Sequence, residues 1–125
     1  MKFLLDTHVL IWAFSNSPLL SGMARETIQN GENLIFVSAV TAWEIAIKKS
    51  IGRLQAPDNF EEELENHRFL ALDINNHHAL ATGLLPYHHK DPFDRLLISQ
   101  ANCEELVLLT HDKIFQQYDV KMLLI

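Results

Sequence analysis

The sequence predicts an α/β fold: a three-layer α/β/α sandwich with a mostly parallel central sheet. Five short apolar runs lack the alternation of polar and apolar residues, and helical segments separate them. Strands covered on both faces give such continuous runs, which is the pattern of parallel sheets. Strands that alternate with helices indicate βαβ units. Because 125 residues suit one compact domain and no linker or repeat interrupts them, residues 1–125 are expected to form a single domain.

The expected elements follow one another along the whole chain. Strands are predicted at Phe3–Leu5, Leu34–Val37, Phe69–Leu72, Leu106–Leu109 and Lys121–Leu124. Helices are predicted over the apolar stretch His8–Phe14, after Ser17-Pro18, and over Ala39–Ser50, Pro57–Asn66, Asn75–Gly83 and Pro92–Glu104, with a last turn or two after Asp112. Proline suits the first turn of a helix, so Pro18 and Pro92 are expected near helix starts.

Composition limits the classes of function. Ten Lys and Arg against sixteen Asp and Glu give a net charge of −6, which argues against a broad basic surface for nucleic acid. The single Cys103, in a helix expected to be buried, excludes an internal disulfide and is consistent with a reducing compartment. No apolar run approaches the ~20 residues of a membrane span, and no signal-peptide cleavage site follows the N-terminal run. We expect a soluble, cytoplasmic protein with no membrane association.

Four acidic residues are expected at one edge of the sheet. Asp6 directly follows the first strand, and Asp112 follows the run that ends at Leu109. Glu44 falls on the apolar, inward stripe of the helix Ala39–Ser50, and Asp94 lies in the first turn of the helix that starts at Pro92. Strand carboxyl ends and helix amino ends share one edge in parallel sheets, and ligands bind there.

Three of these acids also have a structural explanation. Asp6 or Thr7 can cap the helix that follows the first strand. Asp91 is expected to be the N-cap of the helix from Pro92, which puts Asp94 where the helix dipole favours negative charge. Asp112 can cap a short helix beginning at Lys113.

Glu44 has two structural explanations of its own. Thr41-x-x-Glu44 matches a capping box, provided that the helix begins at Thr41, but Ser38 is an equally good cap. Glu44 and Lys48 form a favourable i,i+4 pair. Structural and functional roles of Glu44 both remain open from the sequence.

Carboxylates that converge repel one another, and a bound cation or protonation relieves the repulsion. Ligand sets made only of oxygen select hard divalent ions such as Mg²⁺ or Mn²⁺. Such ions clamp phosphodiesters and activate water. No Gly-rich phosphate loop is present, so we do not expect a P-loop nucleotide site.

The chain resembles a known family in four segments. LLDTHVLIW, VSAVTAWEIAIKK, DPFDRLLISQA and LLTHDKIF occur in the order and spacing of PIN domains, and they particularly resemble the VapC-type toxin ribonucleases. The resemblance spans essentially the whole chain. It implies a metal-dependent nuclease that acts on RNA, forms a homodimer and is silenced by an antitoxin protein.

The resemblance also implies a set of site residues. Asp6, Glu44, Asp94 and Asp112 match the acidic quartet that binds Mg²⁺ or Mn²⁺ and carries catalysis. The small hydroxyl positions beside the acids are Thr7, Ser38 and Thr110, which are expected to orient carboxylates or water. Asp91 is an extra acid, expected to cap its helix and not to bind metal.

Basic residues near the expected edge are candidates for RNA contacts. Arg95, beside Asp94, is the best of them, and Lys48 and Lys113 follow. The other local basic residues are Lys49, Arg53 and Lys90. A solvated helix face is the alternative for Lys48, Lys49 and Arg53, and Arg95 can equally pair with a neighbouring acid.

The histidines do not form a zinc motif. His77-His78 and His88-His89 lack matching Cys or spaced acid ligands, so we expect them in surface loops. His8 and His111 flank two of the four acids, where they can contact substrate, pack or remain solvated.

Two other functions remain open at this point. One is a binding module of the same fold, with little catalysis, that sequesters RNA or a partner protein. The other is a receiver-like phospho-acceptor domain, in which clustered acids also bind Mg²⁺ at a sheet edge.

Overall fold

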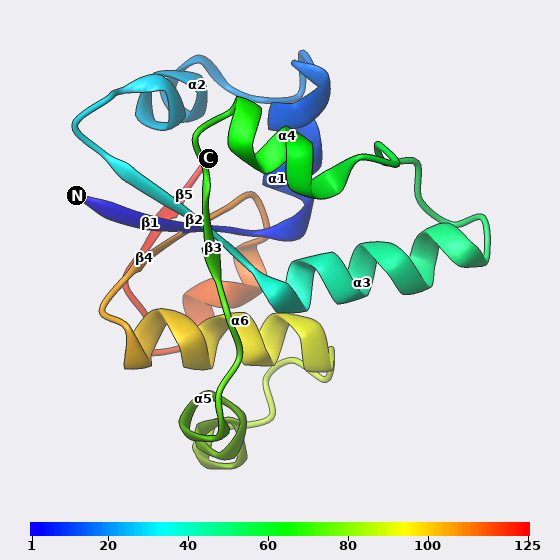
Figure 1. The fold of residues 1–125 in the computed structure, drawn as a ribbon. Coiled ribbons are helices and arrows are strands. Elements are labelled where there is room, and N and C mark those ends of the chain that lie inside the picture. Colours follow the sequence, from blue (N-terminus) through cyan, green and yellow to red (C-terminus); the bar gives the residue numbers. More distant parts are fainter.

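The computed structural model describes all residues from 1 to 125, and its centre is a five-stranded sheet with every neighbouring pair parallel (Figure 1). The strands run in the order β3-β2-β1-β4-β5, so the chain starts in the middle and builds outward on both sides. Their bounds are β1 Lys2–Leu5, β2 Leu34–Ser38, β3 Leu70–Leu72, β4 Val107–Thr110 and β5 Met122–Leu124. All five predicted strands are present, and the predicted fold class is confirmed.

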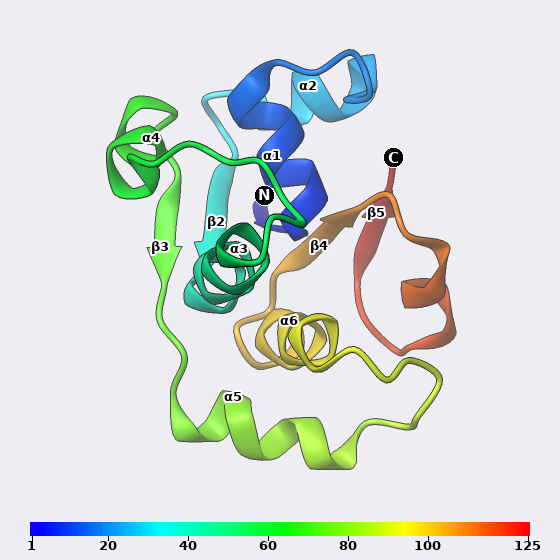
Figure 2. The ribbon, with the colours of Figure 1, turned by 90° about the vertical axis from the view of Figure 1, so that its right-hand side faces the viewer.

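Helices cover both faces of the sheet. They are α1 Thr7–Ser15, α2 Gly22–Gln29, α3 Ala39–Ser50, α4 Phe60–Asn66, α5 Asn76–Ala81 and α6 Pro92–Cys103, with 3₁₀ turns η1 Thr82–Leu84 and η2 Lys113–Gln117. Figure 2 shows α1, α2 and α4 on one side of the sheet and α5 and α6 on the other. Two apolar cores result, because successive residues of a strand point to opposite faces: Leu5 packs under α1 and α4, whereas Leu4 packs against α6.

Two helices begin later than predicted. Pro18 lies in a turn, and α2 begins only at Gly22, where the Ser21 hydroxyl accepts a hydrogen bond from the backbone of Ala24. The turn forms because the Ser17 hydroxyl accepts from the Leu19 backbone N–H, a local bond that competes with a helix. The next case is similar, since Pro57 precedes α4 by three residues and the helix starts at Phe60.

The two helices that carry Glu44 and Asp94 are fixed by caps. Ser38, at the end of β2, is the N-cap of α3, and its hydroxyl accepts from the Val40 N–H at 3.0 Å. Thr41 therefore lies inside the helix, and the capping-box explanation of Glu44 is wrong. Asp91 caps α6 as predicted, with Pro92 as the first helical residue.

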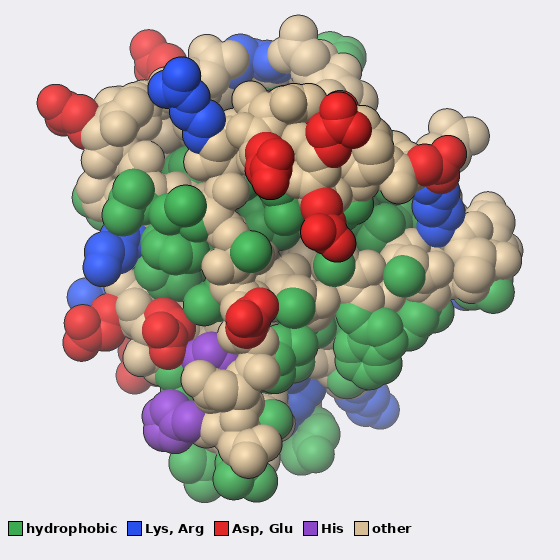
Figure 3. All heavy atoms as spheres, viewed as in Figure 1, with side chains coloured by type: hydrophobic (Ala, Val, Ile, Leu, Met, Phe, Trp, Pro, Cys, Tyr) green, Lys and Arg blue, Asp and Glu red, His purple; other side chains and the backbone are tan.

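One face of the molecule shows the acidic character of the chain. Figure 3 shows acidic side chains gathered over α4, while the basic side chains on this face are dispersed. The first turn of α4 alone holds Glu61, Glu62 and Glu63. No helix of the structure is both long enough and apolar enough to span a membrane.

The two edges of the sheet should contribute unequally to stability. Leu108 in β4 is fully buried, whereas Leu124 in the outer strand β5 is half-buried. We expect Leu108→Ala to lower the free energy of unfolding by about 2–5 kcal/mol, because it leaves a cavity in a closed core. The matched change Leu124→Ala should cost less than half as much. Urea unfolding curves measure both, and equal losses would contradict this account of the core.

Candidate functional site

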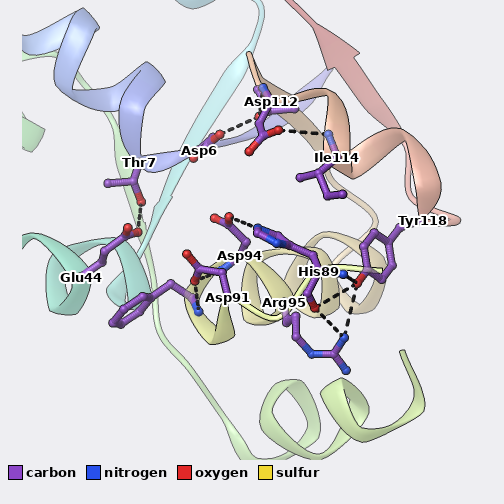
Figure 4. Close-up of polar contacts among 12 residues, drawn as sticks. Asp6, Thr7, Glu44, His89, Asp91, Asp94, Arg95, Asp112, Ile114 and Tyr118 are labelled. Carbon is purple, nitrogen blue, oxygen red and sulfur yellow. Dashed lines mark hydrogen bonds and ion pairs between the residues drawn. The ribbon is translucent and has the colours of Figure 1, made fainter. Parts of the chain in front are cut away.

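The structure brings the four predicted acids into one pocket. Asp6, Glu44, Asp94 and Asp112 all line a pocket of about 660 Å³ at the carboxyl edge of the sheet. They come from the end of β1, the middle of α3, the first turn of α6 and the segment after β4, and Figure 4 shows them facing a common space. The parallel sheet therefore brings together residues that are far apart in the chain, such as Asp6 and Asp112, which are 106 positions apart.

Asp6 is held by the neighbouring strand. Its carboxylate is 5% exposed and accepts a hydrogen bond from the Thr110 hydroxyl at 2.6 Å. Its backbone N–H donates to the carbonyl of Leu109 at 3.0 Å, which continues the β1–β4 ladder. Asp6 occupies the N-cap position of α1, but its side chain makes no capping bond, so capping does not explain this acid. Burial, assisted by the charge of Glu44, raises the pKa of Asp6 above its usual value.

Glu44 is equally buried, at 3% exposure, and its two oxygens have different partners. Thr7 donates its hydroxyl to Oε1 at 2.7 Å, and Lys48 forms an ion pair with Oε2 one turn further along α3. The predicted i,i+4 pair with Lys48 is present. Because Thr7 is the first residue of α1, this contact joins α1 to α3 at the pocket.

Asp94 faces the pocket from the first turn of α6. Its Oδ2 accepts from Nε2 of His89 at 2.6 Å. Burial, together with the negative charge of Asp6, raises the pKa of Asp94 to about 7, and the contact with His89 opposes that rise. The carboxyl group therefore lies in surroundings that disfavour its ionised form.

His89 and Asp112 complete the pocket. One ligand atom each of His89, Asp94 and Asp112 lies within 4.8 Å of the others, a spacing that can hold a metal ion. Asp112 is exposed and also caps η2, where it accepts from the Ile114 N–H at 3.0 Å. His89 was expected in a surface loop, but its ring is half-buried against Asp94. His89 lies close to Asp94 because of how the loop before α6 folds. No spacing of metal-ligand residues in the sequence indicates this contact.

Arg95, predicted to contact RNA, is buried and bonded to the protein itself. It is 6% exposed, and Figure 4 shows its guanidinium directed away from the acids. The group donates to the loop that precedes α6, at the carbonyls of Thr82, Leu85, Pro86 and His89. It also lies 4.2 Å from the ring of Tyr87. Both terminal nitrogens of the guanidinium donate to backbone carbonyls, so no pair of N–H groups is left to bind an RNA phosphate. The prediction that Arg95 contacts RNA is therefore wrong.

Arg95 instead positions His89. Its guanidinium donates to the His89 carbonyl at 3.3 Å, and the backbone N–H of His89 donates to the Tyr118 hydroxyl at 2.8 Å. The backbone of His89 is thus fixed on both sides, and the ring beside Asp94 is fixed with it.

The three predicted hydroxyls have different partners. Thr110 bonds Asp6 and Thr7 bonds Glu44, so both orient an acid. Ser38 does not touch an acid, because its hydroxyl caps α3 and donates to the Gln100 side chain. Ser38 therefore does not orient a carboxylate, and its predicted alternative role toward water stays a prediction.

Two further histidines and two lysines line the pocket, whereas His78 is buried elsewhere. His8, His111, Lys48 and Lys113 line the pocket with the acids, as does the ring of Trp12. His78 was expected in a surface loop, but it is 1% exposed beneath α6, with Nε2 donating to Glu104 at 2.9 Å. Cys103 is half-buried and not fully enclosed.

The donor set suits a hard divalent cation. Five carboxylates line one pocket, because Asp91 joins the four predicted acids, and the basic side chains that contact them are Lys48 at Glu44 and His89 at Asp94. Burial and the repulsion between carboxylates raise the pKa values of Asp6 and Asp94. The neighbouring donors therefore do not fully compensate the negative charge of these two groups. Carboxylate oxygens, with one adjacent imidazole, fit Mg²⁺ or Mn²⁺.

The pKa of Asp94 predicts how pH affects stability without metal. A carboxyl group whose folded pKa is raised stabilises the fold when protonated, and this contribution is lost as pH rises from about 4 to above 7. We expect Asp94→Asn to raise the Tm of the protein in EDTA at pH 8 by about 4 °C or more, and to have less effect at pH 5. Thermal melts at both pH values measure this. A lower Tm at pH 8 would contradict the assigned electrostatics.

Comparisons with solved structures identify the same fold. VapBC2 from Rickettsia felis, bound to a DNA fragment from its promoter, contains a chain that superposes with a TM-score of 0.73 at 17% identity, covering 98% of both chains. DNA-bound VapBC from Salmonella typhimurium gives 0.71 at 20%, covering 98% of this chain and 97% of the other. VapBC-1 from nontypeable Haemophilus influenzae gives 0.66 at 23%, covering 99% and 98%.

The sequence itself matches a family model. A comparison with curated proteins gives no match. The model of the PIN domain, however, matches residues 3–121, which include all four acids and every strand up to the beginning of β5. Because this match spans nearly the whole chain, the protein belongs to the PIN domain family.

Proposed function

We propose that this protein is a divalent-metal-dependent endoribonuclease of the VapC type, the toxin of a toxin–antitoxin pair. The observation that carries the proposal is the convergence of Asp6, Glu44, Asp94 and Asp112, from four separate segments, on one pocket. Its membership of the PIN family supports nuclease chemistry. That membership also counts against a receiver-like phospho-acceptor.

The four acids would hold one or two Mg²⁺ or Mn²⁺ ions. Such a cation supplies positive charge for phosphodiester oxygens and lowers the pKa of an attacking water. The chain orients the carboxylates beforehand: Thr110 binds Asp6, Thr7 binds Glu44, and His89 binds Asp94. Fixed acceptors lose little conformational freedom when the site fills, which favours a precise geometry for hydrolysis.

Lys48 and Lys113 are the proposed phosphate contacts. Both line the pocket beside the acids, and Lys113 is exposed. The net charge of −6 leaves few other cations to attract RNA. The bound metal would therefore provide much of the local positive field, and binding should depend on it.

An antitoxin protein and a second copy of the chain are the proposed partners. The VapBC neighbours are toxin–antitoxin complexes, which supports the first. Trp43 and Ile47 on α3 and Ile51 at its C-cap follow at a spacing of four residues and are 55%, 38% and 60% exposed. An apolar stripe of this kind is typical of a protein contact surface, which supports an additional interaction. A cytoplasmic location would accompany this function.

Removal of one buried acid tests catalysis. We expect Asp6→Asn to lower Mn²⁺-dependent cleavage of single-stranded RNA at least ~100-fold, because a metal ligand and its charge are lost. The fold should survive, since asparagine still accepts from Thr110 and the buried charge is removed. The rate should also vanish in EDTA and return with Mn²⁺. Asp119→Asn changes an exposed acid outside the pocket and is the matched control. Equal cleavage by Asp6→Asn and wild type would refute the site.

Growth of a bacterial host separates catalysis from binding. We expect expression of the wild type to arrest growth, while Asp94→Asn and Asp112→Asn do not, because both acids belong to the proposed metal site. Colony counts after induction measure the difference, with equal protein levels verified by immunoblot. Arrest by all three proteins would favour a PIN-fold module that acts by binding RNA or a partner.

A further inference from the structure

We propose that His8, Trp12 and His111 form a stacking site for an unpaired nucleobase of the RNA, beside the acidic pocket. The inference rests on the proposed nuclease function, and it names the part of the substrate that this side of the pocket would bind. The three residues are called the aromatic rim below.

The aromatic rim is a continuous group of rings. His8 and Trp12 lie one turn apart on α1, with ring centroids 6.3 Å apart. His111, which follows β4, also contacts Trp12, with ring centroids 5.3 Å apart and an interplanar angle of 72°. Two distant segments of the chain thus place their rings against the same indole.

The aromatic rim adjoins the acids. His8 is two residues from Asp6, and His111 directly precedes Asp112. All three rings line the same pocket as the four acids, and Trp12 is the one hydrophobic residue among the pocket's lining residues. An RNA phosphate at the acids would therefore hold its attached nucleosides within reach of these rings.

The rings are both accessible and oriented. His8 and His111 are exposed and Trp12 is half-buried, with part of its indole packed against the core. His111 is fixed because its Nδ1 donates to the carbonyl of Ile125 at 2.6 Å. A platform whose rings are already fixed loses little entropy when a flat ligand stacks on it.

The chemistry favours a base over other ligands. Aromatic side chains stack on any nucleobase, and such contacts hold single strands with little sequence preference. A duplex offers no free base face within the strand, so the site selects an unpaired nucleotide.

Kinetics of matched variants test the role of the indole. We expect Trp12→Ala to raise the KM for a short single-stranded RNA about tenfold with little change in kcat, because stacking acts in both the ground and transition states. Trp12→Phe, which keeps a ring, should recover most of the loss. His8→Ala should raise KM by a smaller factor without disturbing the core. His77→Ala removes an exposed ring outside the pocket and should leave KM unchanged.

Fluorescence supplies a readout that does not require cleavage. The chain has two tryptophans, so Trp43→Phe leaves Trp12 as the sole indole emitter and Trp12→Phe leaves Trp43. With the four acids intact and Mn²⁺ present, a single-stranded oligoadenylate with non-hydrolysable linkages should quench Trp12 and leave Trp43 unaffected. An oligomer of the same length and charge without bases should quench neither.

The outcomes distinguish the two proposals. If the protein cleaves RNA but Trp12→Ala leaves KM unchanged and the base-free oligomer quenches Trp12 as strongly as oligoadenylate, the stacking site is refuted and the nuclease stands. If no RNA is cleaved but only the base-bearing oligomer quenches Trp12, the nuclease fails and the stacking site survives. Should Trp12→Ala fail to fold, Trp12→Phe, His8→Ala and the quenching experiment still decide.

Discussion

The buried carboxylate of Asp6 is the constraint on which the site depends. An ionised acid inside an apolar sheet is costly unless it is hydrogen-bonded, paired or bound to metal. The chain meets part of this cost with one bond, from the Thr110 hydroxyl, which joins the carboxyl ends of β1 and β4. The raised pKa of Asp6 shows that the bond does not offset the whole cost. Asp6 therefore both joins the central strands β1 and β4 and belongs to the proposed metal site.

The surrounding residues extend the same principle. Glu44 and Asp94 also lie inside the protein, and each has a polar partner on another segment: Thr7 for Glu44 and His89 for Asp94. These partners fix the directions of the carboxylates without neutralising all their charge. The pocket consequently remains electronegative, and a divalent cation would both stabilise the folded chain and equip it for phosphodiester chemistry.

Arg95 illustrates a buried cation with a structural role. Its guanidinium binds backbone carbonyls and stacks on Tyr87, so it organises the loop between η1 and α6. That loop places His89 against Asp94. Arg95 follows the proposed metal ligand Asp94 in sequence but does not enter the pocket. It acts indirectly, because it holds the backbone of His89, whose ring contacts Asp94.

The sequence by itself determined which elements form and in what order, but not the starts of α2 and α4. Short apolar runs specified the parallel strands, because both faces of such strands are covered, and Asp91-Pro92 specified the start of α6, because a cap is a local interaction. The order of strands and helices placed Asp6, Glu44, Asp94 and Asp112 at one edge. Only the tertiary structure decided which side chains contact one another. Arg95 binds the loop before α6, His89 contacts Asp94, and Ser38 bonds Gln100. It also decided that His78 is buried beside Glu104. These contacts depend on how loops and layers pack, and neither periodicity nor local spacing encodes that arrangement.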